Sequence, residues 1–324
     1  MATKRNFGVF ILTHGRANNI KTDKALRARD YTGDIHYVID DGDEQQQDYI
    51  NRYGTDNVHI FSKTEEEKHF DPGDLSTDRR TIVYARNASQ RIAKNLGYTH
   101  ILQLDDDYTS FSPRIVRGIE LLEPFTGRLD DIFAAFCDFL DETNAQTVAM
   151  AQGGDFIGGA ASTRYWQGIT RKAMNTFFIN TNNPIQFQGR INEDVNTYVE
   201  QGNTGTLFFT ISKYAIVQTT TQSNQGGMTD TYKATGTYLK TFHTIMRNPS
   251  STKVGIIQAT NQPRIHHSIS WKHTTPMILN PQHKKHTMKL NKENSEHCSK
   301  ERKKPCHANK PNANTTEQKE NATP

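Results

Sequence analysis

Short apolar runs without alternation recur along the first part of the sequence, at residues 7–12, 34–39, 57–62 and 101–104. Runs of this length bounded by polar residues are typical of strands that are buried on both faces of a parallel sheet. Between them, helical spacing of apolar positions predicts helices. The pattern therefore predicts an α/β fold with a mostly parallel, Rossmann-like sheet flanked by helices. The two helices expected in this part cover residues 19–29 and 81–96.

The second part of the sequence continues with strands and helices in alternation. Residues 63–78 are polar and charged and predict a loop, and residues 219–228 predict a glycine-rich loop that closes over substrate. A glycine-dense stretch after residue 152 suits close backbone approach to a ligand. The further strands are expected at 147–152, 175–180, 205–218 and 254–257, and the further helices at 129–140, 192–198 and 229–246.

The last 44 residues differ in composition from the rest of the chain. Residues 281–324 contain almost no apolar side chains and carry ten Lys/Arg and five Asp/Glu, so this segment accounts for the +4 charge of the whole chain. Such a segment buries too little surface to offset its ordering entropy. We expect one catalytic domain at 1–280 and a disordered basic tail at 281–324. The tail either touches nucleic acid or only adds solubility.

Cysteine use and hydropathy indicate a protein of a reducing compartment. The three cysteines form no disulfide framework, and Cys137 lies in an apolar helical pattern that predicts a buried thiol. Cys298 and Cys306 have neighbouring histidines, but their spacing matches no common zinc site. No run reaches membrane-spanning length, and the first run is too short for a signal peptide. We expect a cytoplasmic protein without a membrane partner.

Three consecutive carboxylates follow the run at 101–104. Ligands of open α/β sheets bind at the carboxyl ends of the strands, and unpaired carboxylates are too costly to bury in a dry core. Asp105 and Asp107 are two positions apart, so on an extended chain both side chains point to one side. Two hard oxygen ligands suit Mn²⁺ or Mg²⁺, which takes its other ligands from water and substrate phosphates. This predicts a metal site, with an acidic surface turn as the alternative.

Polar residues also follow the first two runs, at the same predicted edge of the sheet. A glycine before a helix start allows close approach of a phosphate, and a carboxylate after the second strand commonly accepts a hydrogen bond from ribose or base. Arg86 either reaches a diphosphate, because arginine binds phosphate oxygens through two nitrogens, or lies on a surface face. The residues predicted to bind a nucleotide are Thr13, His14, Gly15, Arg16, Asp40, Asp41, Arg86, Asp105 and Asp106.

Two later motifs carry further candidate chemistry. Glu193 and Asp194 begin a predicted helix, where acidic residues either do chemistry or only complement the helix dipole. His266 and His267 lie late in the chain, and a histidine there is a candidate third ligand for a metal that upstream carboxylates hold. A histidine pair alone is also consistent with a structural role.

Five motifs in this order resemble a GT-A-like glycosyltransferase over residues 7–271. They are the THGR that follows the first run, the acidic tip of the second, the DxD-type Asp105 and Asp107, the Glu193-Asp194 pair and the late histidines. The strings ILTHGR, LQLDDDY and NED resemble most closely the TET-associated glycosyltransferases. That family comprises bacteriophage enzymes thought to add sugars to oxidised or hydroxymethylated DNA bases.

The resemblance implies a hexosyl- or pentosyltransferase that uses a nucleotide-sugar, with a UDP-sugar expected, and Mn²⁺ or Mg²⁺. It implies that Asp105 and Asp107 with His266 or His267 hold the metal, and that Asp194, or else Glu193, is the catalytic base. The acceptor it implies is 5-hydroxymethylcytosine in phage DNA. A protein, lipid or glycan acceptor shares the donor residues, and a nucleotidyltransferase shares the sheet and metal. The arginines and lysines considered for a local DNA-binding patch are Arg79, Arg80, Arg86, Arg91, Lys94, Arg114 and Arg117.

Overall fold

Strand β1 (Phe7–Leu12) is buried along its length, as its unbroken apolar sequence predicts. It pairs in parallel with β2 (Asp34–Asp40) on one side and β4 (His100–Asp105) on the other. Strand β3 (Val58–Phe61) extends the parallel set beyond β2. The carboxyl ends of these four strands therefore meet at one edge of the sheet, which confirms the predicted arrangement of the strand tips.

The computed structural model describes residues 5–125, 127–218, 238–258 and 263–275, which belong to one compact unit. Three predictions concern residues outside these ranges. They are the loop at 219–228, the first part of the helix expected from residue 229, and the tail at 281–324 with Cys298 and Cys306.

The other half of the sheet is mixed, so the prediction of a mostly parallel sheet is wrong in this part. Strand β10 (Phe177–Asn180) runs antiparallel to both β4 and β8 (Thr147–Ala151). Strand β11 (Phe208–Gln218) is parallel to β8, and the unpredicted strand β5 (Tyr108–Pro113) is antiparallel to β11. The order is β3-β2-β1-β4-β10-β8-β11-β5, and β9 (Ile169–Thr170) also pairs with β11. The predicted α/β class, with a sheet flanked by helices, is confirmed, but a strand's direction cannot be deduced from an apolar run.

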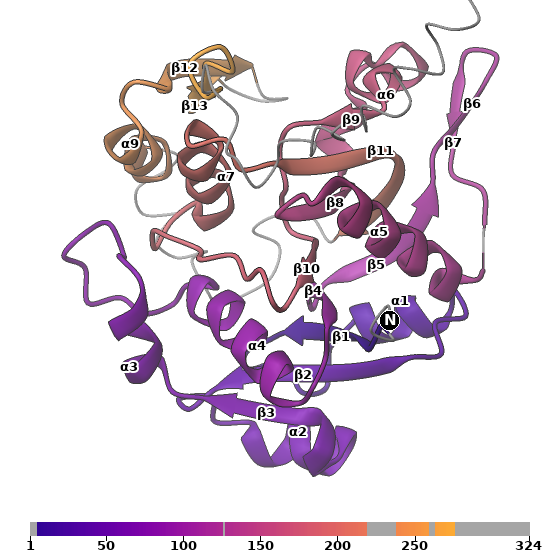
Figure 1. Cartoon of the computed structure of the whole chain (residues 1–324), viewed down its shortest axis with the longest axis vertical. Coiled ribbons are helices and arrows are strands. Elements are labelled where there is room, and N and C mark those ends of the chain that lie inside the picture. Colours follow the sequence, from indigo (N-terminus) through magenta and orange to yellow (C-terminus); the bar gives the residue numbers. More distant parts are fainter. Residues whose placement is uncertain (1–4, 126, 219–237, 259–262, 276–324) are drawn as a thin grey trace, which may run out of the picture. The chain divides into compact units, whose positions relative to one another are not determined.

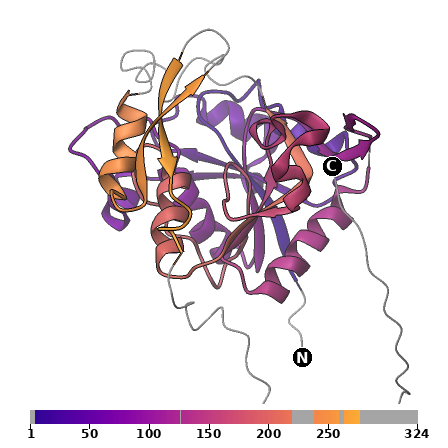
Figure 2. The same ribbon diagram turned by 90° about the horizontal axis from the view of Figure 1, so that it is seen from above.

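Helices cover both faces of the sheet (Figures 1 and 2). One face contacts α1 (Thr22–Arg27), α2 (Gln46–Tyr53) and α5 (Leu129–Thr143), and the other contacts α4 (Val83–Asn95) and α7 (Glu193–Asn203). Helix α2 is not predicted by the sequence. None of the described helices is long and apolar enough to cross a lipid bilayer.

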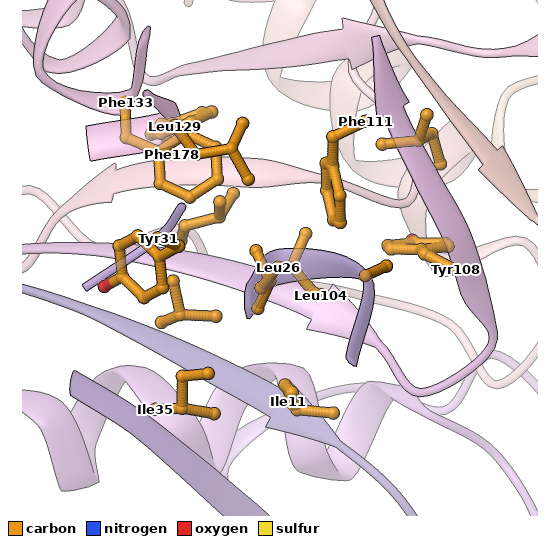
Figure 3. Close-up of a cluster of buried hydrophobic side chains, with 14 of the residues drawn as sticks. Ile11, Leu26, Tyr31, Ile35, Leu104, Tyr108, Phe111, Leu129, Phe133 and Phe178 are labelled. Carbon is orange, nitrogen blue, oxygen red and sulfur yellow. The ribbon is translucent and has the colours of Figure 1, made fainter. Parts of the chain in front are cut away.

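Successive side chains of each strand point to opposite faces of the sheet, so the core has two layers. Val9 and Ile11 of β1 contact the layer of α1 and α5, whereas Phe10 and Leu12 contact the layer of α4 and α7. Figure 3 shows the first layer, where Leu26, Leu129 and Phe133 from the helices meet Ile11, Ile35 and Leu104 from the strands. Cys137 of α5 is buried in this layer, as predicted, and burial raises the pKa of its thiol to about 12.

A small hairpin lies outside the main sheet. Among the strands that the structure describes, β12 (Thr252–Gln258) and β13 (Pro263–Ile269) pair with each other alone, and both contact α9 (Tyr238–Arg247). Helix α9 lies beside α7 in both views (Figures 1 and 2). The hairpin and α9 therefore lie next to the residues that begin α7.

The remaining described elements are short. The polar segment expected as a loop at 63–78 begins with α3 (Lys63–Glu66) and a 3-10 turn, so that prediction is wrong in its first residues. The other short elements are β6 (Ile115–Arg117), β7 (Glu120–Leu122), α6 (Thr163–Gln167), and 3-10 turns at Thr55–Asn57, Glu67–His69, Gly153–Phe156 and Gly159–Ala161.

Candidate active site

The carboxyl ends of β1, β2 and β4 open into one cleft of about 1110 Å³. The start of α7 and the β12–β13 hairpin line it as well. Gly15 and Asp41 are the two predicted site residues that do not line the cleft; Asp41 is exposed, and its Oδ1 accepts a hydrogen bond from the Lys63 amide. The predicted residues that line the cleft are Thr13, His14, Arg16, Asp40, Arg86, Asp105, Asp106, Asp107, Glu193, Asp194, His266 and His267.

Asp105 and Asp106 contact different parts of the protein. Strand β4 ends at Asp105, and Asp106 and Asp107 form the turn into β5, so the extended geometry expected for Asp105 and Asp107 is wrong. Asp106 is only 4% exposed. Its Oδ2 accepts a hydrogen bond from Thr13 Oγ1 at 2.7 Å, and its Oδ1 pairs with Arg16 Nη1 at 2.6 Å. Asp106 thereby ties the tip of β4 to the tip of β1.

The tip of β1 is held by a residue that the sequence did not indicate. Tyr49 of α2 accepts a hydrogen bond from the Arg16 amide at 2.8 Å, and its hydroxyl lies 3.0 Å from Thr13 Oγ1. Gly15 has a φ of +65°, which glycine adopts without strain, and its amide donates to Asp43 Oδ2 at 2.7 Å. The loop is therefore fixed from both sides.

Asp40, at the tip of β2, lies between His14 and Lys63. His14 Nδ1 is 2.6 Å from Asp40 Oδ2, and Lys63 Nζ is 3.0 Å from Oδ1. Burial acts to raise the pKa of Asp40, but these two partners outweigh it and lower the pKa to about 2. The same hydrogen bond raises the pKa of His14. Asp40 is thus a permanent acceptor at the wall of the cleft.

Arg86 is buried, so its interpretation as a surface residue is wrong. The side chain from α4 is 1% exposed and lies over the ring of Phe177 at 4.8 Å. Its Nη2 is 3.2 Å from Asp105 Oδ1, and its Nε is 3.0 Å from Glu193 Oε1. Within the described residues, its buried Nη1 has no hydrogen-bond partner. Arg86 therefore joins the metal-candidate aspartate to the acid pair of α7.

Negative charge exceeds positive charge around Asp105. Burial raises its pKa to about 7 although Arg86 opposes the change, and the carboxylates of Asp107, Glu193 and Asp106 raise it further. Crowding of this kind favours a bound cation, because a divalent ion is often the largest local charge that opposes it. The charges around Asp105 therefore favour a bound cation such as Mn²⁺ or Mg²⁺, and Asp105 and Asp107 stay its predicted ligands.

The histidine part of the predicted metal site is less complete. His266 and His267 of β13 have ring centroids 4.2 Å apart, and burial, with His266 and Lys240 nearby, lowers the pKa of His267 to about 3. A neutral imidazole is the form that binds metal. However, no group of three or more His, Cys, Asp or Glu side chains in the described ranges is arranged to hold a metal ion. The four-residue set therefore stays a prediction.

The start of α7 is fixed by α9. Asn192 has a φ of +55°, and its side-chain amide donates to the Lys240 carbonyl and to Thr244 Oγ1, both at 2.8 Å. Asp194 is buried, and burial together with the carboxylate of Glu193 raises its pKa. A carboxylate with a raised pKa is a better proton acceptor near neutral pH than an ordinary one.

Comparison with known proteins agrees with this chemistry. Residues 7–227, about two thirds of the chain, match the TET-associated glycosyltransferase family. The chain belongs to that family. It is therefore a glycosyltransferase, and the carboxylate-lined cleft is its candidate active site. No curated protein matches the chain.

Solved structures resemble this glycosyltransferase only distantly. Glucosyl-3-phosphoglycerate synthase from Mycobacterium tuberculosis, in complex with Mg²⁺ and uridine diphosphate, matches with a TM-score of 0.43 and 9% identity over 82% of this chain and 88% of that chain. A mycobacterial protein matches with a TM-score of 0.42 and 7% identity over 82% and 84%. Similarity at this level does not extend to substrates.

Two of the arginines considered for a DNA-binding patch of this glycosyltransferase cannot belong to an exposed surface. Arg86 and Arg114 are buried, and Arg114 Nη1 lies 2.6 Å from Glu123 Oε2. Arg79 and Arg91 form ion pairs with Glu67 and Glu66, and their side chains stay exposed. Without Arg86 and Arg114, the patch stays a prediction.

Proposed function

We propose that this glycosyltransferase moves a sugar from a UDP-sugar to the hydroxymethyl group of 5-hydroxymethylcytosine in phage DNA, with the help of Mn²⁺ or Mg²⁺. One observation carries the proposal. The Asp105–Asp107 turn is bonded through Asp106 to the tip of β1 and through Arg86 to Glu193 of α7. A donor site and a candidate base therefore share one cleft.

In the proposed donor site, the nucleotide lies against the tips of β1 and β2. Asp40, which stays ionised, accepts hydrogen bonds from the base or ribose. Thr13 and Arg16 lie beside the diphosphate. Asp105 and Asp107 hold the metal, with His266 or His267 as a further candidate ligand. When bound, the metal neutralises the charge that develops on the diphosphate leaving group.

Asp194 is proposed as the base that takes the proton from the acceptor hydroxyl. Glu193 already forms an ion pair with Arg86 at 3.0 Å, whereas the carboxylate of Asp194 accepts only its neighbour's amide at 2.7 Å among the hydrogen bonds described. Its raised pKa brings it closer to neutral pH than an ordinary aspartate. This assignment applies to transfer with inversion; in transfer with retention the same pair would orient the substrate.

The name of the family supports DNA as the acceptor, because TET-associated glycosyltransferases are thought to act on oxidised or hydroxymethylated DNA bases. The C5 substituent of a pyrimidine projects into the major groove, so an enzyme can reach it with or without flipping the base. A protein, lipid or glycan acceptor is the alternative that leaves the donor site unchanged.

The first test is thermal unfolding with a panel of nucleotide-sugars, with and without Mn²⁺. A ligand that binds only the folded state raises the melting temperature. We expect a metal-dependent increase with a UDP-sugar and then a mass increase of DNA that contains 5-hydroxymethylcytosine. An increase with a nucleotide-sugar but no mass change on DNA would contradict the acceptor. Stabilisation by nucleoside triphosphates alone would favour a nucleotidyltransferase.

A further inference from the structure

A cluster of two cations and one carboxylate lines the cleft apart from the proposed donor site. Asp155 is 2% exposed, and its Oδ1 forms ion pairs with Arg164, at 3.0 Å, and with Lys172. All three residues line the cleft. None of them was predicted as a site residue, although the glycine-dense stretch that contains Asp155 was noted as a possible ligand contact.

The local backbone fixes the carboxylate of this cluster. The amide of Gln152 donates to Asp155 Oδ2 at 3.1 Å, and the Asp155 amide donates back to the Gln152 carbonyl at 2.8 Å. Ser162 Oγ donates to the Asp155 carbonyl at 2.8 Å. The carboxylate of Asp155 is therefore fixed in position, and it holds the side chains of Arg164 and Lys172 beside it.

The charges in the cluster do not balance. One carboxylate opposes two cations, so the cluster keeps a net positive charge at the cleft wall. The Arg164 side chain is 53% exposed and the Lys172 side chain 13%, which leaves the guanidinium accessible. A guanidinium has five N–H donors, and one carboxylate oxygen does not occupy them. An anion can therefore bind Arg164 without breaking its pair with Asp155.

The cluster has open space beside it and lies near helix α7. A Cβ added to Gly153 or Gly154 would meet nothing within 4 Å, and Gly154 lines the cleft. The guanidinium of Arg171, next to Lys172 in the chain, lies 5.8 Å from the ring centroid of Trp271, and Trp271 stacks on Tyr198 of α7 at 5.9 Å. The segment that carries Lys172 is therefore close to the helix that begins with the acid pair, whereas the proposed diphosphate site is at the tip of β1.

We propose that Arg164 and Lys172, held by Asp155, form a subsite for a phosphate group of the acceptor nucleic acid strand. This inference rests on the proposed function, since it assumes a DNA acceptor, and it adds where the backbone is bound. A phosphodiester beside the target nucleotide offers the oxygens that arginine binds through two nitrogens. It would position the hydroxymethyl group near Asp194.

The test compares Arg164→Gln with the unaltered protein on two acceptors and one donor. The acceptors are an oligonucleotide that contains 5-hydroxymethylcytosine and the free 5-hydroxymethyl nucleoside, which has no phosphate. We expect about a tenfold higher KM for the oligonucleotide, the fold-change for loss of one charge-assisted hydrogen bond. The salt dependence of oligonucleotide binding should weaken by a slope of about 0.9. The KM values for the nucleoside and the donor should not change.

Two control variants make the result specific. Arg164→Lys keeps the charge but not the contact through two nitrogens, so it should recover only part of the oligonucleotide affinity. Arg117→Gln removes an exposed arginine of β6 that does not line the cleft, and it should behave as the unaltered protein. The melting temperature of Arg164→Gln with and without donor shows that the variant folds.

The outcomes separate this inference from the proposed function. An unchanged oligonucleotide KM in Arg164→Gln, or equal losses on oligonucleotide and nucleoside, would overturn the subsite while the DNA acceptor stands. A raised KM for the donor alone would assign the cluster to the donor diphosphate and would also overturn it. If the unaltered protein transfers sugar to no hydroxymethylated DNA, the proposed acceptor is wrong, and the subsite is rejected with it.

Discussion

Arg86 and Glu193 form a buried ion pair with a 3.0 Å Nε–Oε1 distance across 107 positions of the chain. The same guanidinium lies 3.2 Å from Asp105. One residue of α4 thus connects the carboxylate at the end of β4 with the first residue of α7. One side chain therefore joins a proposed metal ligand to the proposed acid pair.

Replacement of this arginine should destabilise the protein strongly. Arg86→Gln leaves two carboxylates without their cation in a buried place, which typically costs about 3–5 kcal/mol of unfolding free energy. The loss of unfolding free energy should be smaller at lower pH, because carboxyl groups that are protonated carry no charge for the guanidinium to neutralise. Urea denaturation at pH 5 and pH 8 measures both effects. Lys94→Gln, at an exposed position of the same helix, should change stability by less than about 0.5 kcal/mol. A similar small change in Arg86→Gln would contradict the buried pair.

The pH dependence of transfer should reveal Asp194. Burial and the neighbouring Glu193 raise its pKa above the ordinary value of 3.8, so the base becomes protonated, and activity falls, at a higher pH than an ordinary aspartate would give. The measurement is kcat/KM against pH, which reports the free enzyme. Asp194→Asn should keep the donor-induced thermal shift and lose transfer. If kcat/KM fell only near pH 3.8, the ordinary pKa of an aspartate, Asp194 would not be the base.

Asp107 should be needed for metal-dependent binding but not for folding. Asp107→Asn removes one proposed metal ligand at a half-buried turn, and we expect the Mn²⁺-dependent shift with nucleotide-sugar to disappear. Turnover should fall by on the order of a hundredfold or more, since the metal contributes several kcal/mol to the transition state. Asp41→Asn removes an exposed carboxylate outside the cleft and serves as the control. Full activity of Asp107→Asn would rule out the DxD assignment.

Asn192 should position the acid pair. Asn192→Ala loses two hydrogen bonds to α9 and leaves an alanine at a φ of +55°, so we expect a loss of about 2 kcal/mol in unfolding free energy. Asn192→Gly tolerates this backbone but also lacks the amide. Both variants should lower kcat and leave the donor KM unchanged. If Asn192→Gly had the same kcat as the unaltered protein, the side-chain amide of Asn192 would not be needed to position the acid pair.

The sequence predicts best those parts that are buried on both faces. Strand β1 is a continuous apolar run, and β2 and β4 are apolar runs interrupted by His36 and Gln103; their polar tips are correctly predicted at one edge. Strand β5 was missed because YTSFSP alternates with serine and ends in proline, and its pairing with β11 is a long-range contact. Helix α2 carries its apolar positions at Tyr49, Ile50 and Tyr53, a weak helical signal between polar residues.

The sequence predicts which residues form the candidate site better than it predicts how they contact one another. Nothing near Arg86 indicates burial, because its partners Asp105 and Glu193 come from other elements. Asp106 is engaged with Thr13 and Arg16 because the chain turns after Asp105, and an apolar pattern does not show where a strand ends to within one residue. Asp155 with its two cations depends in the same way on segments that meet only in the fold.

Because β10 runs antiparallel to β4, it ends at the edge of the sheet that lies opposite the cleft. Its last residue pairs with His100 at the start of β4, and the Thr181 amide donates to the Thr99 carbonyl at 3.0 Å, at the edge of the sheet opposite the cleft. The exposed Asn182 follows directly. The chain then returns to the cleft before α7 begins. A fluorescent label or an immobilising tag attached beside Asn182 therefore lies away from the cleft, so binding at the cleft can be followed on labelled or immobilised protein.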